Sequence, residues 1–191
     1  MFTVVYDANV LYPAPLRDIL IRLARTRLFH ARWTDAILDE VFRNLSAKRP
    51  DLDAGALERT RHLMCEAVPD CMIEGWELLM DGLQLPDPDD RHILAAAIRA
   101  GAKVIVTTNL RDFPPAPLAA FGIEAQHPDI FVLGLIDLDP GAVVTVVHQQ
   151  QEDLKRNPKT VPELLDILER QGLVQSVAEL RGRLFDDTSS A

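Results

Sequence analysis

The segment from residue 85 to residue 112 constrains the fold of this chain more than any other. Acidic side chains, the last of them Asp90, precede an apolar stretch with helical spacing, and an apolar run then leads to Asn109 and Asp112. A helix followed by a buried strand is the repeating unit of parallel α/β sheets. Such sheets bind ligands along the edge where the carboxyl ends of their strands meet. The segment therefore predicts a polar site at that edge.

The first nine residues predict a second strand that ends at the same edge. Residues 2–6 form an uninterrupted β-branched and aromatic run, as expected of a central parallel strand that is covered on both faces. Asp7 follows this run directly. We therefore expect its carboxylate to lie close to Asp90 and Asn109.

The rest of the chain predicts an α/β fold with an all-helical addition. Strand and helix patterns alternate up to about residue 138, which indicates a parallel β-sheet flanked by helices. From there on only helical patterns occur, and two of them open with the capping-box sequences Thr160–Glu163 and Ser176–Glu179. We predict a domain over residues 1–138, a helical C-terminal extension over 139–186 and a disordered tail over 187–191.

Helix starts within the first part are predicted from residues that commonly cap helices. Thr34 is expected to cap one helix, and either Asp51 or Asp53 is expected to cap the next, which runs to about Val68. A short strand is expected near residues 71–73.

Composition indicates a globular protein, for which we expect a cytoplasmic location. With 191 residues and 48% hydrophobic content, the chain can bury one sizeable core. No apolar run approaches the roughly 18 residues needed to cross a bilayer, and the N-terminus lacks a signal-peptide pattern, so no membrane partner is expected. Cys65 and Cys71 have no companions at zinc-ligand spacing, which excludes a structural zinc motif.

The net charge of −9 weighs at first against a nucleic-acid partner, whose binding usually needs a basic surface. Residues 11–62, however, hold ten Lys and Arg against seven acids. The acidic excess lies elsewhere, partly in the predicted site. Clustered carboxylates repel phosphate unless a divalent cation lies between them, so this excess indicates a metal before it excludes RNA or DNA.

The polar residues of interest at the predicted edge are Asp7, Glu40, Asp87, Asp89, Asp90, Asn109 and Asp112. Taken singly, each has an ordinary role as a helix cap, a solvated flank or an Asx turn. A cap needs only one acid, however, and three acids within four residues repel one another unless a cation binds. We expect Asp89 to be solvated surface. Asp7, Asp90, Asn109 and Asp112 together supply hard oxygen ligands without compensating lysines, a set that suits Mg²⁺ or Mn²⁺.

Four stretches together resemble the PIN-domain ribonucleases, particularly the VapC-like toxins of bacterial toxin–antitoxin modules. They are Asp7-Ala-Asn-Val-Leu, Leu-Asp-Glu40-Val-Phe-Arg-Asn-Leu, Asp90-Arg-His-Ile-Leu-Ala-Ala-Ala and Val-Thr-Thr-Asn109-Leu-Arg-Asp112-Phe. The resemblance covers residues 1 to about 138 and implies a PIN-like sheet there. The helical tail resembles the C-terminal extension of a longer subgroup of these toxins.

The resemblance implies a metal-dependent endoribonuclease that hydrolyses RNA phosphodiester bonds with Mg²⁺ or Mn²⁺, as the toxin of a toxin–antitoxin module. Its acidic metal site would comprise Asp7, Glu40, Asp90 and Asp112. Asn109 would be catalytic beside them, at a position where many relatives carry another Asp. Further partners implied are a cognate antitoxin that offers a basic side chain, and a second copy of the chain in a homodimer.

Residues around the acidic set receive supporting roles from the same resemblance. Asn9 and Thr108 would orient the ligands. Arg17, Arg43 and Arg111 are candidates for contact with the RNA backbone.

Two other functions fit parts of the sequence. A catalytically silent PIN fold that acts as an RNA or protein adapter is favoured by Asn109. A phosphatase of the haloacid-dehalogenase type would use Asp7 as its nucleophile, but Asn9 replaces the second acid of that motif. The absence of a Gly-x-Gly-x-x-Gly motif after the first strand argues against a Rossmann dinucleotide site.

Overall fold

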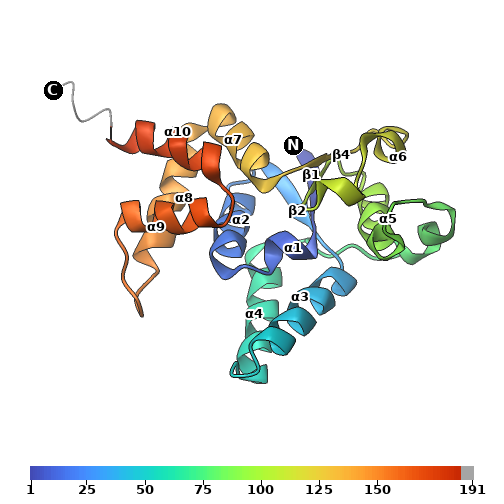
Figure 1. Ribbon diagram of the computed structural model, residues 1–191, viewed down its shortest axis with the longest axis horizontal. Helices are drawn as coiled ribbons and strands as arrows, with labels where there is room; N and C mark the ends of the chain where they lie inside the picture. The colour runs from blue at the N-terminus through green and yellow to red at the C-terminus, as the bar shows by residue number, and fades with distance from the viewer. Residues whose placement is uncertain (186–191) are drawn as a thin grey trace.

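The computed structural model describes residues 1–185 and contains a four-stranded parallel sheet flanked by helices (Figure 1). The strand order is β2-β1-β3-β4, and each neighbouring pair is parallel. The predicted α/β class is therefore confirmed. The strands are β1 (Phe2–Tyr6), β2 (Phe29–Arg32), β3 (Val104–Val106) and β4 (Glu124–Gln126).

Helices connect successive strands, as parallel pairing requires. The α-helices of this part are α1 (Ala8–Leu11), α2 (Ala14–Arg25), α3 (Asp35–Lys48), α4 (Ala54–Ala67), α5 (Arg91–Ala100), α6 (Pro115–Ala119) and α7 (Pro128–Leu138). Three short 3₁₀ turns accompany them: η1 (Glu77–Gly82), η2 (Pro88–Asp90) and η3 (Leu110–Asp112).

The predicted caps of α3 and α4 are confirmed. The Thr34 hydroxyl accepts a hydrogen bond from Ile37 N at 3.1 Å, and the Asp53 carboxylate accepts one from Ala56 N at 2.8 Å. Asp51 pairs with Arg49 instead. Each cap satisfies an N–H group that has no partner within the helix.

An aromatic cluster joins the sheet to the helices that cover it. The Tyr6 ring lies 6.3 Å from both Phe29 and Trp33, and Phe29 lies 5.0 Å from Phe131 of α7. The buried Tyr6 hydroxyl donates to Leu20 O at 3.1 Å. These contacts fix β1 and β2 against α2 and α7, and so fix where β1 ends.

Strand β2 is an element that the sequence patterns did not predict. It has four residues, of which Phe29 and Ala31 are buried while His30 is exposed. It lies at an edge of the sheet, where so short a strand leaves little apolar signal. The strand expected near residues 71–73 is reduced to one parallel bridge between Met72 and Trp33.

The C-terminal region is all-helical, as predicted. It contains α8 (Pro140–Glu152), α9 (Val161–Arg170) and α10 (Val174–Phe185). The Thr160–Glu163 capping box is present, with both reciprocal hydrogen bonds. The division predicted at residue 138 falls between α7 and α8 and stays a prediction, and the tail predicted over 187–191 lies outside the described residues.

The second predicted capping box is wrong. Helix α10 begins at Val174, so Ser176 lies in its first turn. The buried Asp129 carboxylate of α7 accepts hydrogen bonds from Gln175 N at 2.9 Å and Ser176 N at 2.8 Å. The Ser176 hydroxyl donates to Asp129 O at 2.8 Å. A side chain more than forty residues away thus replaces the local cap and anchors α10 to α7.

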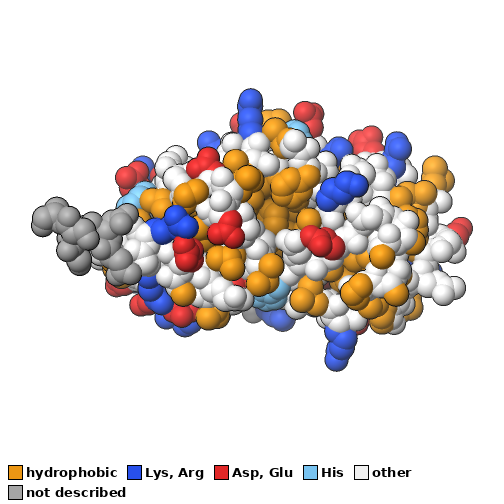
Figure 2. Space-filling model, turned by 90° about the horizontal axis from the view of Figure 1, so that it is seen from above, with side chains coloured by type: hydrophobic (Ala, Val, Ile, Leu, Met, Phe, Trp, Pro, Cys, Tyr) orange, Lys and Arg blue, Asp and Glu red, His pale blue; other side chains and the backbone are white. Residues whose placement is uncertain are grey.

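The surface seen in Figure 2 mixes acidic, basic and apolar side chains. Within residues 1–185, no helix combines the length and the apolar character needed to span a membrane.

Candidate functional site

Asp7 lies at the carboxyl end of β1 and is held there by polar groups of its neighbours. Its backbone N–H donates to Val106 O at 3.1 Å, so the ends of β1 and β3 lie side by side. Its side chain is only 4% exposed and does not cap α1. The carboxylate instead accepts hydrogen bonds from Asn9 Nδ2 at 2.5 Å and from the Thr107 hydroxyl at 2.7 Å. These two donors fix its orientation.

Thr107 connects the residues of this edge, although the family resemblance implied this role for Thr108. The buried Thr107 hydroxyl also accepts hydrogen bonds from Asn9 Nδ2 and Asn109 N, both at 2.9 Å. Thr108 is exposed and contributes only its backbone N–H, which donates to Asn9 Oδ1 at 3.0 Å. Successive side chains of an extended chain point to opposite sides, and that alternation is the signal that could have identified Thr107.

Asp87, Asp90 and Asp112 form a compact acidic cluster. One carboxylate oxygen from each lies within 4.8 Å of the others. Asp87 also accepts a hydrogen bond from Asp89 N at 2.9 Å and so caps η2, whereas the Asp90 side chain makes no cap. Asp112 accepts a hydrogen bond from Asn109 Nδ2. Asp89 is exposed, as expected.

The electrostatics of the cluster favour a bound cation. Burial, followed by the charges of the neighbouring acids, of which Asp7 acts most strongly, raises the pKa of Asp90 to about 6. Burial also raises the pKa of Asp7, although the Thr107 hydrogen bond opposes that shift. Within residues 1–185, no Lys or Arg forms an ion pair with Asp7, Asp87, Asp90 or Asp112.

Glu40 approaches this cluster from α3 without joining its tightest part. Its charge contributes to the raised pKa of Asp90, but its carboxylate lies 3.7 Å from His92 Nε2. The His92 ring is mostly buried and packs beside Trp76 at 5.9 Å. The structure thus brings Glu40 to the rim of the acidic cluster.

The three arginines considered for RNA contact differ in their surroundings. Arg17 donates from Nη1 to Leu11 O at 2.8 Å and to Tyr12 O at 3.1 Å, which satisfies the carboxyl end of α1. Arg43 and Arg111 are exposed. Arg17 therefore has a structural role at the end of α1.

The donor set fits a hard divalent cation. Asp90 Oδ2 is buried and has no hydrogen-bond partner in the described part of the chain. An ionised buried oxygen without a donor is costly, and a cation would supply the missing partner. Carboxylate oxygens are also the ligands that Mg²⁺ and Mn²⁺ prefer. The acidic cluster can therefore hold a metal ion.

Comparison with known proteins gives two family matches and one curated relative. The PIN domain model matches residues 3–111, and the VapC50 C-terminal domain model matches residues 128–182. A protein of Mycobacterium tuberculosis (strain ATCC 25618 / H37Rv) named "Putative ribonuclease VapC50" is 44% identical over 100 residues. That alignment spans 52% of this chain and 58% of the relative's length. No solved structure matches.

Proposed function

The chain belongs to the PIN-domain family, and from that premise we propose that it is a metal-dependent endoribonuclease that hydrolyses RNA phosphodiester bonds. The name of its relative, a ribonuclease, supports the choice of RNA as the substrate. The family assignment also argues against the phosphatase alternative, since that enzyme class has a different fold. We keep the silent adapter as the rival, because the amide of Asn109 stands in the acidic site.

The observation that carries the proposal is the partnerless oxygen of Asp90, which lies among acids from its own segment and from two others. Asp7 follows β1, Asp87 and Asp90 precede α5, and Asp112 follows β3. Gathering these negative charges without a basic partner lowers the stability of the folded state unless a cation is bound. The same cation would let a phosphate approach an acidic surface.

We propose that Asp87, Asp90 and Asp112 bind the cation and that Asp7 lies beside them. Asn9 and Thr107 keep the Asp7 carboxylate in one orientation through their hydrogen bonds. When bound, a divalent cation supplies a more acidic water and positive charge against the scissile phosphate. No side chain needs to attack the phosphorus. The role of the protein is therefore to hold the carboxylates where they can bind the cation.

The test is cleavage of a structured RNA by the purified chain with Mn²⁺ and with EDTA. We expect cleavage only with the metal, and a loss of more than about a hundredfold in Asp7→Asn and Asp90→Asn. Asp89→Asn is the matched control, because Asp89 is exposed and one residue away. Cleavage that persists in both site variants would remove these acids from the mechanism. RNA binding without any cleavage would favour the adapter.

We further propose that the chain acts as the toxin of a toxin–antitoxin module. The VapC50 C-terminal match and the VapC-type relative support this role. An antitoxin would then place a basic side chain against the acidic cluster, and the chain would form a homodimer. Induced expression should stop growth, and Asp90→Asn should not. Sequencing the ends of cellular RNAs after brief induction would identify the target, and unchanged RNA ends would count against the role.

A further inference from the structure

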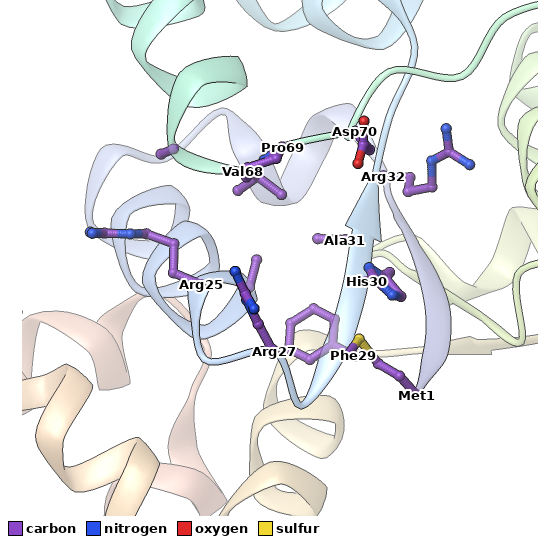
Figure 3. Close-up of a pocket in the computed structure, with 12 residues that line it drawn as sticks. Met1, Arg25, Arg27, Phe29, His30, Ala31, Arg32, Val68, Pro69 and Asp70 are labelled. Carbon is purple, nitrogen blue, oxygen red and sulfur yellow. The ribbon is translucent and has the colours of Figure 1, made fainter.

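A cleft lies along the outer edge of β2, apart from the acidic cluster. It has a volume of about 460 Å³, within the range of small-molecule sites. One wall comes from the turn between α2 and β2 and from β2 itself, and the other from residues 67–70 after α4. Figure 3 shows Val68, Pro69 and Asp70 across from Phe29 and Ala31. None of the acids of the candidate metal site lines it.

The charged side chains that line this cleft are mostly basic. Arg25, Arg27, His30 and Arg32 line it, and Asp70 is its one acid among the residues that the structure describes. Figure 3 places Arg25 and Arg27 on one side of β2, and His30 and Arg32 on the other. Three guanidinium groups against one carboxylate leave a net charge of +2 with His30 neutral. The residues that line the cleft thus carry a net positive charge, although the net charge of the chain is −9.

The arginines of the cleft lack carboxylate partners in the part of the chain that the structure describes. Within residues 1–185, no ion pair involves Arg25, Arg27 or Arg32, whereas Arg22, Arg61 and others each pair with an acid. Arg32 donates from Nη2 to Met72 O at 2.6 Å, but its Nε is buried without an acceptor. Buried donors in native proteins normally have a partner, and an ordered water or an oxygen of a ligand could accept from this one.

Two strained residues face each other across the same cleft. Arg27 has a φ of 62° and Asp70 a φ of 58°, and they are the only non-glycine residues with positive φ among residues 1–185. Glycine would adopt this conformation without strain, and Arg27 stands where a helix ending in this way commonly carries glycine. Backbone strain of this kind concentrates at sites that bind ligands. The strain at Arg27 is explained if its guanidinium is needed in the cleft.

We propose that this cleft binds a phosphomonoester, that is, an organic molecule or chain end that carries a terminal phosphate. Such a group bears about −1.5 to −2 charges at neutral pH, which matches a net +2 better than a single carboxylate does. Guanidinium groups also bind phosphate oxygens through paired hydrogen bonds. The exposed apolar side chains of Met1 and Pro69, which also line the cleft, would contact the organic part.

The site does not depend on the proposed nuclease activity, and the experiment separates the two. Titration calorimetry of the full chain in EDTA removes any metal-bridged phosphate from the acidic cluster. The probes are inorganic phosphate, uridine 5′-monophosphate, uridine, and a five-nucleotide RNA with either a 5′-phosphate or a 5′-hydroxyl. We expect uridine 5′-monophosphate to bind with one site per chain and uridine not to bind. Binding of the 5′-phosphorylated RNA but not its hydroxyl form would assign the site to RNA ends. Binding of the small probes alone would assign it to free phosphate esters.

Variants of Arg27 supply the control for folding. Arg27→Gln should weaken binding about tenfold or more, because a charge-assisted contact is lost. Arg27→Gly should weaken it equally and also raise Tm, because the strain at this position is relieved. Arg156→Gln is the matched control: it removes one exposed charge far along the chain and should leave affinity unchanged. The proposal is overturned if every phosphate probe binds Arg27→Gln as tightly as it binds the wild type. It is also overturned if uridine binds as tightly as uridine 5′-monophosphate, or if Arg156→Gln weakens binding as much as Arg27→Gln does.

Discussion

Replacing Asp90 by asparagine is expected to stabilise the metal-free protein while removing its affinity for a divalent cation. Asp90 is partly buried among other carboxylates, and burial and those charges raise its pKa to about 6. Its ionised form is therefore unfavourable in the folded state at pH 7. Asparagine has nearly the same shape and carries no charge, so the substitution removes that penalty.

The size of the effect follows from the pKa of Asp90. The pKa rises from 3.8 to about 6, and each unit corresponds to about 1.4 kcal/mol, which gives an upper value of about 3 kcal/mol. Because Asp90 is partly exposed, solvent and salt screen its charge, and we expect about 1–2 kcal/mol to be realised. In a chain of this size that gain corresponds to a rise in Tm of roughly 3–6 °C.

The stability gain has a definite pH dependence. Between about pH 4 and pH 6 the folded chain holds a proton on Asp90 that the unfolded chain has released. The contribution of this group to wild-type stability therefore falls as the pH rises through that window. The difference between Asp90→Asn and wild type should be largest at pH 7 and should shrink by roughly half or more at pH 4.5.

Urea unfolding followed by circular dichroism, at both pH values in EDTA, measures this difference. Added Mn²⁺ should then stabilise wild type and leave Asp90→Asn unchanged, since only a folded state that binds the ion gains stability from it. Asp89→Asn, an exposed neighbour, should alter stability by less than about 0.5 kcal/mol. The reasoning is refuted if Asp90→Asn is the less stable protein at pH 7, or if its gain is the same at pH 4.5.

Three further substitutions test other contacts. Thr107→Val should lower Mn²⁺ affinity, measured by calorimetry, about 10- to 100-fold, because the buried Asp7 carboxylate loses a hydrogen bond. Thr108→Val should have little effect, and a larger loss of affinity in Thr108→Val than in Thr107→Val would contradict the assignment. Asp129→Ala should lower the free energy of unfolding, measured with urea, by about 2 kcal/mol, because α10 loses its cap. The exposed control Asp137→Ala should lower it by less than about 0.5 kcal/mol, and equal effects would show that the cap is unimportant. Asn109→Asp should increase Mn²⁺ affinity and lower metal-free stability, because it adds another acid beside the cluster. A rise in stability in EDTA would contradict this.

Much of the fold could be predicted from local patterns. The continuous apolar run before Asp7 and the capping side chains of Thr34 and Thr160 act within a few residues, and the structure contains β1 and both caps. Strand β2 could not be predicted in this way. It is four residues long, and its Phe29 and Ala31 are buried by helices that lie elsewhere in the sequence.

The candidate site was predictable in its residue types and less so in its geometry. The rule that parallel strands end at one edge was enough to place Asp7 near Asp90. It could not show that the tight cluster includes Asp87, that Glu40 stays at the rim beside His92, or that Asn109 donates to a neighbouring acid. Those outcomes depend on side-chain directions at the ends of elements.

The sequence by itself determined most of the strands and helices, with β2 as an exception, and which of them carry acids, because periodicity, capping and chain direction are local properties. The tertiary structure alone decided which charges lack a partner. Asp129 is buried against the start of α10, whereas Asp90 keeps an oxygen without a donor and the arginines along β2 have no carboxylate. Whether a polar group is satisfied depends on distances between segments far apart in the chain, and folding sets those distances through packing.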